Sequence, residues 1–348
     1  YINGASEEGI GRYFERYPED RKKVFLVTKA HPARGLEPGD LTKSLTGSLE
    51  RLKTSYVDLY FLHAVDNVEK KLTPEVKQWA EKAKADGKIR YFGFSTHANM
   101  PDCLEAAAKL GWIDGIMMTY NYRTMAGDQM KAAVDACAKA GIGLTAMKTQ
   151  AKLPREMPSS RPESVSKERW EAAKIFVAQG KLENPSAPPN ELAIKLTERF
   201  RKKGFSMEQA KLNVIWENPH IASICSAMYN MTVLTQNVAA AAGKVKLTRK
   251  DKDLLSLYAA QSAHQYCAGC TRFCQSGAEK DLPIGDVMRS LMYARDYGDR
   301  DLGKTTFRSL PSRVRRAIER TDYAKAKKRC PNGLPIGRLM REAAVELA

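Results

Sequence analysis

Short apolar runs alternate with longer amphipathic stretches between residues 24 and 227. The apolar runs contain few polar side chains, which is typical of parallel strands covered on both faces. The stretches between them carry apolar residues three to four positions apart, which predicts helices with one buried face. The six predicted strands are residues 24–30, 57–63, 90–96, 114–121, 142–148 and 221–227.

Repeated strand–helix units with short connections are typical of two folds, a doubly wound sheet and an eight-stranded barrel. Helical stretches such as 101–112 and 128–141 end at glycines, which favour helix termination. No strand is followed by G-x-G-x-x-G, the phosphate-binding turn of doubly wound nucleotide folds. We therefore expect an α/β protein with a (β/α)8 TIM barrel, and because six strands are found, we expect the first two to be missing before residue 1.

Two regions interrupt the alternation of strands and helices. Residues 150–190 are rich in proline, serine and charge, which predicts an insertion or lid around one helix. Beyond about residue 250 no strand pattern remains, and the chain becomes helical and basic. The sequence therefore predicts a barrel domain over residues 1–248 and a helical domain over residues 249–348.

The formal net charge is +17, and the excess of positive charge is concentrated near the end of the chain. Between Arg300 and Arg341 there are thirteen Lys or Arg residues and three Asp or Glu residues. Such a segment can bind nucleic acid, an acidic protein or an anionic membrane, or can simply be a solvated helix surface. No nucleic-acid motif and no membrane-length apolar run accompany it. We expect a solvated surface, without nucleic-acid or membrane binding, that could dock an acidic redox partner.

The cysteines are unevenly distributed along the chain. A chain of this size does not need disulfides, so a crowded group of cysteines favours a metal or redox role. Two later segments resemble each other, LPIGDVMR at 282–289 and LPIGRLMR at 334–341, and a Cys-Pro pair precedes the second. The cysteines of the crowded segment and of this pair are Cys267, Cys270, Cys274 and Cys330.

These four cysteines form the pattern C-x2-C-x3-C followed by a distant C-P. Bacterial ferredoxins bind their clusters with three closely spaced cysteines and a distant Cys-Pro, in two similar halves, although their first spacings are both x2. The pattern predicts a ferredoxin-like domain with one 4Fe–4S cluster. Zinc, which also accepts four thiolates, and buried thiols without metal are the alternatives. Cys103, Cys137 and Cys225 are expected to be ordinary small core residues.

Two predicted strands end in ionisable residues, Lys29 in VFLVTK and His63 in DLYFLH. Barrel enzymes place catalytic groups at such strand ends, although either residue alone could be structural. With Tyr1 before NGASEEGIG, these residues resemble the aldo-keto reductase superfamily, in which D-T-A-x-x-Y-x-x-G-x-S-E precedes a strand-ending Lys and then a strand-ending His. The resemblance covers roughly residues 1–243, and the tail resembles the extension of an iron–sulfur-carrying branch.

The resemblance implies a nicotinamide-dependent oxidoreductase that reduces aldehydes or ketones, or oxidises sugar-like alcohols, by hydride transfer. Tyr1 would be the general acid, and the ammonium of Lys29 would lower the pKa of its phenol. The family's carboxylate partner of the lysine would lie five residues before Tyr1, outside this chain. His63 would orient the carbonyl group or assist proton transfer.

The family's nicotinamide contacts are only partly retained. Ser95 matches the serine of a Ser-Asn pair, but Thr96 replaces the Asn and Met117 replaces a Gln. The positions that bind the 2′-phosphate of NADP through cations hold Ala227 and Val233, so the choice between NAD and NADP stays open. The predicted NAD(P)H-binding residues are Ser95, Asn121, Met147, Gln236 and Asn237.

Two functions are compatible with these features. One is an enzyme with an accessory cluster, favoured by the Tyr-Lys-His set. The other is an electron-transfer or non-catalytic iron–sulfur protein on a reductase scaffold, favoured by the altered cofactor contacts. Because clusters are assembled in the cytoplasm, we expect a cytoplasmic location, with a periplasmic one through a missing twin-arginine signal as the alternative.

Overall fold

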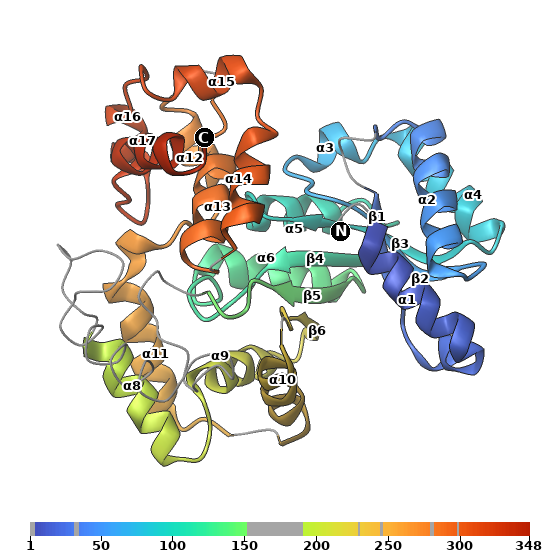
Figure 1. The fold of residues 1–348 in the computed structure, drawn as a ribbon, viewed down its shortest axis with the longest axis horizontal. Coiled ribbons are helices and arrows are strands. Elements are labelled where there is room, and N and C mark those ends of the chain that lie inside the picture. The colour runs from blue at the N-terminus through green and yellow to red at the C-terminus, as the bar shows by residue number, and fades with distance from the viewer. Residues whose placement is uncertain are drawn as a thin grey trace. The chain divides into compact units, whose positions relative to one another are not determined.

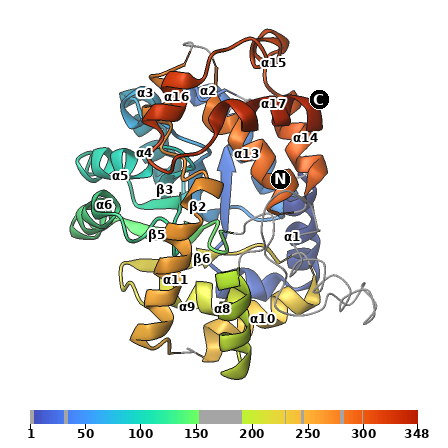
Figure 2. The same cartoon turned by 90° about the vertical axis from the view of Figure 1, so that its left-hand side faces the viewer.

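The computed structural model describes residues 4–30, 35–151, 191–228, 230–243, 246–278, 282–297 and 299–348 (Figures 1 and 2). The chain divides into two compact units. The first comprises Tyr1–Thr119, Asp128–Thr145 and His220–Ser223, and the second comprises Tyr120–Gly127, Ala146–Pro219 and Ile224–Ala348. The boundary predicted at residue 248 stays a prediction, and most of the predicted 150–190 insertion lies outside the described residues.

The six predicted strands are confirmed; five are slightly shorter than expected, and the third is longer by one residue. They lie in one sheet in chain order, and the pairs from β1 to β4 are parallel. The α/β class is therefore confirmed, whereas closure into an eight-stranded barrel stays a prediction. The strands are β1 (Val27–Ala30), β2 (Val57–Leu62), β3 (Ile89–Thr96), β4 (Gly115–Thr119), β5 (Gly143–Met147) and β6 (Ile221–Cys225).

The helices of the first unit follow the predicted amphipathic stretches. Gly87, Gly111 and Gly141, which follow α4, α5 and α6, have φ of 70°, 71° and 74°, a left-handed conformation that glycine adopts without steric cost. They therefore end these helices as the sequence predicts. The elements are α1 (Ala5–Arg16), η2 (Pro18–Lys23), α2 (Pro38–Leu52), α3 (Val68–Lys71), α4 (Pro74–Ala85), α5 (Met100–Ala108) and α6 (Asp128–Lys139).

One face of the sheet in the first unit is covered by aromatic packing. Tyr60 of β2 and Phe92 of β3 are fully buried, and the ring centroid of Trp79 from α4 lies 5.8 Å and 5.9 Å from theirs. Side chains alternate along a strand, so the residues directly before and after Tyr60 in β2, and directly before and after Phe92 in β3, point to the opposite face. That opposite face carries the candidate catalytic residues described below.

A buried carboxylate holds the entry to β1 against β2. Asp58 is 2% exposed and accepts hydrogen bonds from Nη2 of Arg21 and Nη1 of Arg90, each at 2.9 Å. The backbone amide of Leu26 donates to the same carboxylate at 2.8 Å. Because two guanidinium groups and a backbone amide donate to it, the charge of Asp58 is compensated in the interior. The network therefore fixes the register of β1 against β2 at the start of β1.

The second unit contains helices that precede β6 in the chain and helices that follow it. Asp251 of α11 is buried and accepts hydrogen bonds from Nε of Arg199 at 2.7 Å and Nζ of Lys203 at 2.5 Å, both on α8. Burial acts to raise the pKa of Asp251, but bonds from Lys203, Thr248 and Arg199 outweigh it and hold the pKa well below its usual range. The elements are α8 (Glu191–Lys202), α9 (Met207–Trp216), α10 (Met231–Gly243), α11 (Arg249–Gln261) and η4 (Ala263–Gln265).

The remaining helices contain the repeated LPIG segments, and the two copies have the same local structure. Pro283 and Pro335 immediately precede α13 and α17, with φ/ψ of −79°/76° and −76°/65°. The two helices contact each other and share one buried cluster (Figure 2). The repeat therefore begins two related helices. The elements are α12 (Thr271–Gln275), α13 (Ile284–Arg295), α14 (Arg300–Arg308), α15 (Ser312–Ala317), α16 (Ala324–Arg329) and α17 (Ile336–Glu346).

None of the helices within the described ranges has the length and apolar character needed to cross a membrane.

The close approach of β3 and β4 predicts that Gly93→Ala destabilises the protein strongly. A Cβ atom at Gly93 would lie 1.8 Å from the carbonyl oxygen of Gly115 and 3.0 Å from a ring carbon of Phe61. Backbone atoms cannot move away as side chains can, so we expect a loss of about 3 kcal/mol or more. The matched control is Gly39→Ala, where no atom lies within 4 Å of the added Cβ. Thermal unfolding followed by circular dichroism should show a large decrease in Tm for Gly93→Ala alone, and equal Tm values would contradict the prediction.

Candidate functional site

The two described candidate catalytic residues lie at the ends of neighbouring strands. Lys29 pairs with Phe61 in the parallel register of β1 and β2, and His63 follows Phe61 by two residues. The backbone amide of His63 donates to the carbonyl oxygen of Ala30 at 3.0 Å, which continues the strand pairing past β2. Residues paired in register share a face of the sheet, so Lys29 and His63 point to the same side. Tyr1 lies outside the described residues.

Ser95, predicted as a cofactor-binding residue, holds His63 in place. Its Oγ lies 3.1 Å from Nδ1 of His63 and accepts the backbone amide of Ala64 at 3.2 Å. The carbonyl oxygen of Ser95 accepts the amide of Val65 at 2.8 Å, and its side chain is fully buried. Ala64 has φ of 57°, a left-handed conformation that is rare for a residue with a Cβ atom. Ser95 therefore fixes both the histidine ring and the strained turn that follows it.

His97 is a functional candidate that the sequence reasoning missed. Its ring centroid lies 5.9 Å from that of His63, with the planes at 76°, and its Nδ1 lies 3.5 Å from Oγ1 of Thr119. It directly follows β3, so its place one residue beyond a strand end was a signal available in the sequence. The structure thus brings two imidazoles together beside Ser95.

The two substituted nicotinamide positions lie on opposite faces of the sheet. Met117 pairs with Ser95 in the register of β3 and β4, and therefore shares the face of His63. Thr96 points to the other face, where its hydroxyl donates to the carbonyl oxygen of Ala98 at 2.8 Å. Both residues are buried. Of these two positions, only Met117 lies on the face that carries the candidate catalytic residues.

Glu7 anchors the start of α1 to the strand that carries Lys29. Its carboxylate accepts hydrogen bonds from Oγ1 of Thr28 at 2.5 Å and from Nε of Arg51 at 2.7 Å. Burial acts to raise the pKa of Glu7, but hydrogen bonds from Thr28, Ser48 and Arg51 outweigh it and lower the pKa. Glu7 is therefore held ionised, and it ties the segment after Tyr1 to β1 and α2.

In the second unit, Asn121 and Met147 lie at neighbouring strand ends, as predicted. The amide of Tyr120 donates to the carbonyl oxygen of Met147 at 3.1 Å. Nδ2 of Asn121 donates to the carbonyl oxygen of Lys148 at 3.1 Å and to Oη of Tyr266 at 3.0 Å. Oδ1 of Asn121 accepts the amide of Arg123 at 3.0 Å. The fully buried amide of Asn121 is therefore fixed in one orientation.

Lys148 was not a predicted site residue, but its environment is unusual. Its Nζ lies 4.1 Å from the ring centroid of Tyr293 and 5.1 Å from that of Tyr297, both on or after α13. Burial, together with the nearby guanidinium of Arg289, lowers the pKa of Lys148 to about 7. Its φ of 57° places it in the left-handed region. Lys148 is thus a strained lysine directly after Met147, and no apolar pattern in the sequence could reveal its aromatic neighbours.

The predicted adenine-contacting pair lies on α10. Asn237 is 8% exposed, and its Nδ2 donates to the carbonyl oxygen of Ala227 at 3.4 Å. The carbonyl oxygen of Gln236 accepts Nε2 of Gln209 at 3.3 Å. Asn237 therefore fixes the segment that follows β6.

The four predicted cysteine ligands lie in or beside α12 and α16, two helices that contact each other. The thiols of Cys267, Cys270, Cys274 and Cys330 are half-buried and form no disulfide. Burial, with smaller contributions from Cys270, Cys274 and Cys330, raises the pKa of Cys267 to about 12. Burial also raises the pKa of Cys274 to about 11, with Cys270 and Cys330 contributing. The distant Cys330 therefore lies beside the three-cysteine loop.

Two hydrogen bonds close the segment of Cys330 onto the three-cysteine loop. Nδ2 of Asn332 donates to the carbonyl oxygen of Tyr266 at 2.8 Å, and Nη1 of Arg329 donates to that of Ser276 at 2.7 Å. The helices α12 and α16 also contact each other. In the described part of the chain, no group of three or more Cys, His, Asp or Glu side chains is arranged to hold a metal ion.

The other three cysteines do not behave alike. Cys103 and Cys137 are 2% and 0% exposed, and burial raises their pKa values to about 11 and about 12, as expected of core thiols. The prediction for Cys225 is wrong, because this residue is exposed. It ends β6, which is the last strand of the described sheet and in which Ile221 is the one buried residue.

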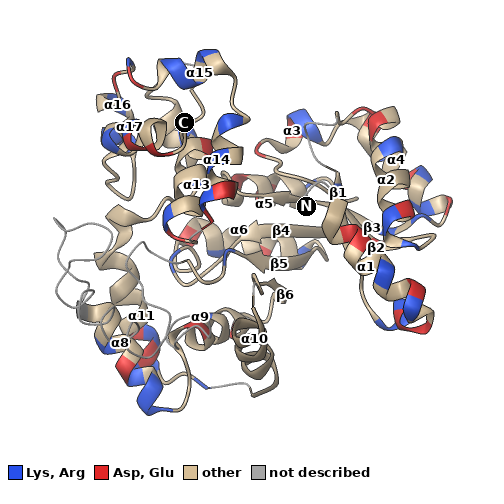
Figure 3. Ribbon diagram, viewed as in Figure 1, with Lys and Arg blue, Asp and Glu red and all other residues tan. Residues whose placement is uncertain are grey.

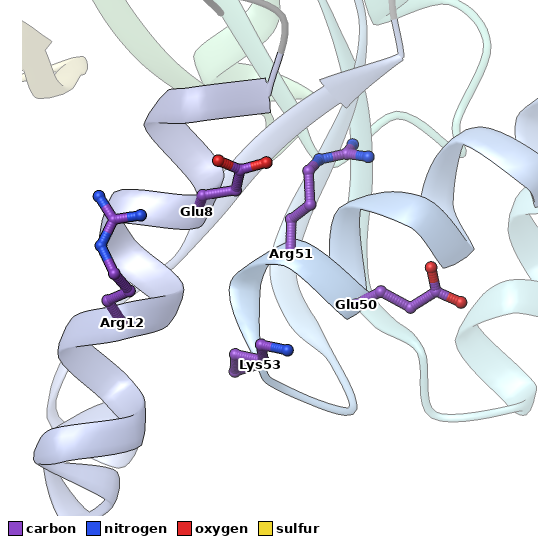
Figure 4. Close-up of a pocket in the computed structure, with 5 residues that line it drawn as sticks. All are labelled: Glu8, Arg12, Glu50, Arg51 and Lys53. Atoms are coloured by element: carbon purple, nitrogen blue, oxygen red, sulfur yellow. The ribbon is translucent and has the colours of Figure 1, made fainter.

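A charged hollow between α1 and the end of α2 lies on the first unit (Figure 4). It contains acids and bases in similar number, and neither Lys29 nor His63 lines it. Its two acids and three bases leave one excess positive charge, and because neither candidate catalytic residue lines it, we assign it no role in the chemistry. Its lining residues are Glu8, Arg12, Glu50, Arg51 and Lys53.

Comparisons with known proteins show what this chain is similar to. The model of the aldo/keto reductase family matches residues 1–255. The uncharacterized oxidoreductase YrpG of Bacillus subtilis is 27% identical over 158 residues, which cover 41% of this chain and 47% of that protein. The NADP(+)-designated aldo-keto reductase yakc of Schizosaccharomyces pombe is 36% identical over 106 residues, 27% of this chain and 30% of that protein. The chain thus spans less than half the length of these two relatives.

A solved structure shares the fold. The aldo-keto reductase of Klebsiella pneumoniae in complex with NADPH superposes with a TM-score of 0.52 at 20% identity, over 74% of this chain and 76% of that chain.

The lowered pKa of Lys148 predicts that Lys148→Met stabilises the protein in a pH-dependent way. The folded-state pKa of about 7 lies below the usual lysine value near 10.4, so below pH 7 the folded state carries a proton that burial disfavours. Between pH 7 and about 10.4 the unfolded state binds more protons, and the stability of the wild type rises with pH. Urea unfolding should therefore show the largest gain for Lys148→Met at pH 6 and a smaller gain at pH 9. Lys327→Met, an exposed control, should show no such trend. A gain independent of pH would contradict the prediction.

Proposed function

The chain belongs to the aldo/keto reductase family, and on this basis we propose that it is a nicotinamide-dependent oxidoreductase of aldehydes, ketones or sugar-like alcohols. The observation that carries the proposal is the placement of Lys29 and His63 on one face at adjacent strand ends, with Ser95 holding the histidine ring. Strand ends are where barrel enzymes carry their catalytic groups. The substitutions at the family's nicotinamide-binding positions leave Lys29 and His63 in place.

In the proposed mechanism Tyr1 donates a proton to the carbonyl oxygen of the substrate. A phenol with a pKa near 10 is a weak acid at neutral pH, and a neighbouring ammonium favours its ionised form. Lys29 would supply that ammonium. Glu7 supports this arrangement because it ties the segment that follows Tyr1 to Thr28, the neighbour of Lys29.

His63 would orient the carbonyl group through its second ring nitrogen. The hydroxyl of Ser95 already accepts the amide of Ala64, so its own proton is available for Nδ1 of His63. A histidine that accepts at Nδ1 carries its proton on Nε2. That proton can donate to a carbonyl oxygen, and Ser95 thereby acts through His63 rather than on the cofactor.

NADP(H) is the proposed cofactor, and when bound it would supply the hydride. The relative yakc is designated for NADP(+), and the solved structure of the Klebsiella protein contains NADPH. Asn121 and Met147 would line the nicotinamide end, and Gln236 and Asn237 the adenine end. The fixed and fully buried amide of Asn121 fits such a role because polar groups in ligand sites need a defined orientation.

We further propose that Cys267, Cys270, Cys274 and Cys330 bind a 4Fe–4S cluster, as in the iron–sulfur branch of the superfamily. Thiolates on one zinc ion lie about 2.3 Å from it and thus roughly 4 Å from one another. Thiolates on a cubane bind separate irons and lie farther apart. The C-x2-C-x3-C spacing with a distant Cys-Pro favours the cluster over zinc, and hydrogen bonds from Asn332 and Arg329 hold the Cys330 segment beside the three-cysteine loop. Because clusters are assembled in the cytoplasm, we propose a cytoplasmic location.

The second candidate is an electron-transfer protein that docks an acidic partner. The observation that favours it is the exposed basic surface of α16, which directly precedes Cys330 (Figure 3). Long-range attraction between such a surface and an acidic partner accelerates association. A redox partner would then approach near the cysteine centre. The exposed basic residues are Lys325, Lys327, Lys328 and Arg329.

The reductase mechanism predicts that Tyr1→Phe lowers turnover by about a hundredfold or more, the typical effect of losing a positioned acid. Lys29→Met should act similarly, because the phenol loses its neighbouring cation. The measurement is oxidation of NADPH at 340 nm with a panel of aldehydes, in a protein that includes any residues preceding Tyr1. Lys23→Met, on the exposed η2 helix, is the matched control for Lys29→Met. Unchanged turnover in both site variants would remove this mechanism.

The cluster assignment predicts about four irons and four sulfides per chain after anaerobic purification, with a brown visible spectrum. Cys330→Ala should lose the cluster because one corner of the cube has no ligand. Cys225→Ala should keep it, because this exposed cysteine lies outside the centre. A colourless protein that contains one zinc ion would overturn the assignment.

A further inference from the structure

Tyr266 connects the candidate cofactor site to the cysteine centre. Its ring is 2% exposed and lies 5.4 Å from the guanidinium carbon of Arg123. Its Oη accepts Nδ2 of Asn121 at 3.0 Å, and the next residue along the chain is Cys267. A single side chain therefore joins a strand-end amide to the first cysteine.

The backbone of Tyr266 is joined to the second cysteine segment as well. Its carbonyl oxygen accepts Nδ2 of Asn332 at 2.8 Å, two residues after Cys330. The bond holds the backbone of Tyr266 only while the segments of Cys267 and Cys330 lie together. A ligand shared by the two segments would fix this geometry, and its loss would release it.

Asn121 receives the effect of this geometry because both protons of its amide nitrogen already have acceptors, while its Oδ1 has a second lone pair. One proton of Nδ2 is directed to the carbonyl oxygen of Lys148 and the other to Tyr266, while Oδ1 accepts the amide of Arg123. If Oη of Tyr266 moves, a buried N–H group loses its acceptor, which is costly in the interior. The side chain of Asn121 must then reorient.

We propose that Tyr266 is a positioning residue that couples the cysteine centre to nicotinamide-cofactor binding. An intact cysteine centre holds Tyr266, which holds Asn121 in the orientation that receives the cofactor. This inference rests on the proposed function, because it takes both the cofactor and the cluster as ligands of the chain. It adds a role for the centre, namely control of cofactor affinity.

Linkage makes the coupling reciprocal. If the intact centre raises the affinity for the cofactor, the bound cofactor must stabilise the intact centre by the same factor. NADP(+) should therefore perturb the visible spectrum of the cluster and slow iron loss to a chelator. Both effects should pass through the hydroxyl of Tyr266, because it makes the bond to Asn121.

The test compares Tyr266→Phe with Tyr323→Phe in the full chain with its cluster. Both variants remove one buried hydroxyl and keep the ring. Tyr323 donates to the carbonyl oxygen of Ile318 at 2.9 Å, a bond that does not reach Asn121. The readouts are the Kd of NADPH from nicotinamide fluorescence, the iron content, and the change in the visible spectrum on adding NADP(+). Steady-state kinetics would supply the separate effects on KM and kcat.

We expect Tyr266→Phe to weaken NADPH binding by about two- to tenfold, the effect of one lost hydrogen bond. The iron content should be unchanged, the spectral response to NADP(+) should disappear, and KM for NADPH should rise with little change in kcat. Tyr323→Phe should match the wild type. If the wild type binds both ligands and Tyr266→Phe binds NADPH equally well, the coupling is overturned and the proposed function stands. If the wild type takes up no iron or binds no NADPH, the proposed function fails, and the coupling is overturned with it.

Discussion

The parallel register of β1, β2 and β3 is the constraint on which the chemistry of the first unit depends. It places Lys29, His63 and Ser95 on one face, while Tyr60 and Phe92 point to the other face and pack with a helix. A shift of one residue would turn the candidate catalytic groups towards that helix. The buried network of Asp58 opposes such a shift, because moving the strand would leave its charge without donors.

The same register explains why the histidine can be held so firmly. Ser95 lies at the level of His63 on the adjacent strand, so a short hydroxyl side chain reaches both Nδ1 and the following amide. The sequence predicted Ser95 as a cofactor contact, but it did not predict that the hydroxyl of Ser95 contacts His63. His97 shows the same limitation, since its proximity to His63 depends on how two strand ends lie beside each other.

The second unit contains a comparable link between distant segments. The two LPIG copies begin helices of matching geometry, and their contact brings Cys330 beside the three-cysteine loop. Tyr266 then joins this loop to Asn121, a residue 145 positions away in the chain. A centre that serves only to staple helices would not need this bond, which is why the coupling to the cofactor site is the inference that we draw.

The sequence by itself determined the six strands, the glycines that end helices and the set of cysteines, because these depend on apolar periodicity and on local backbone preference. Only the tertiary structure decided which of these residues are partners. It exposed Cys225 at the last described strand, surrounded Lys148 with tyrosines and directed Asn121 to Tyr266. Such contacts depend on register and helix packing between segments far apart in the chain, and neither leaves a periodic pattern in the sequence.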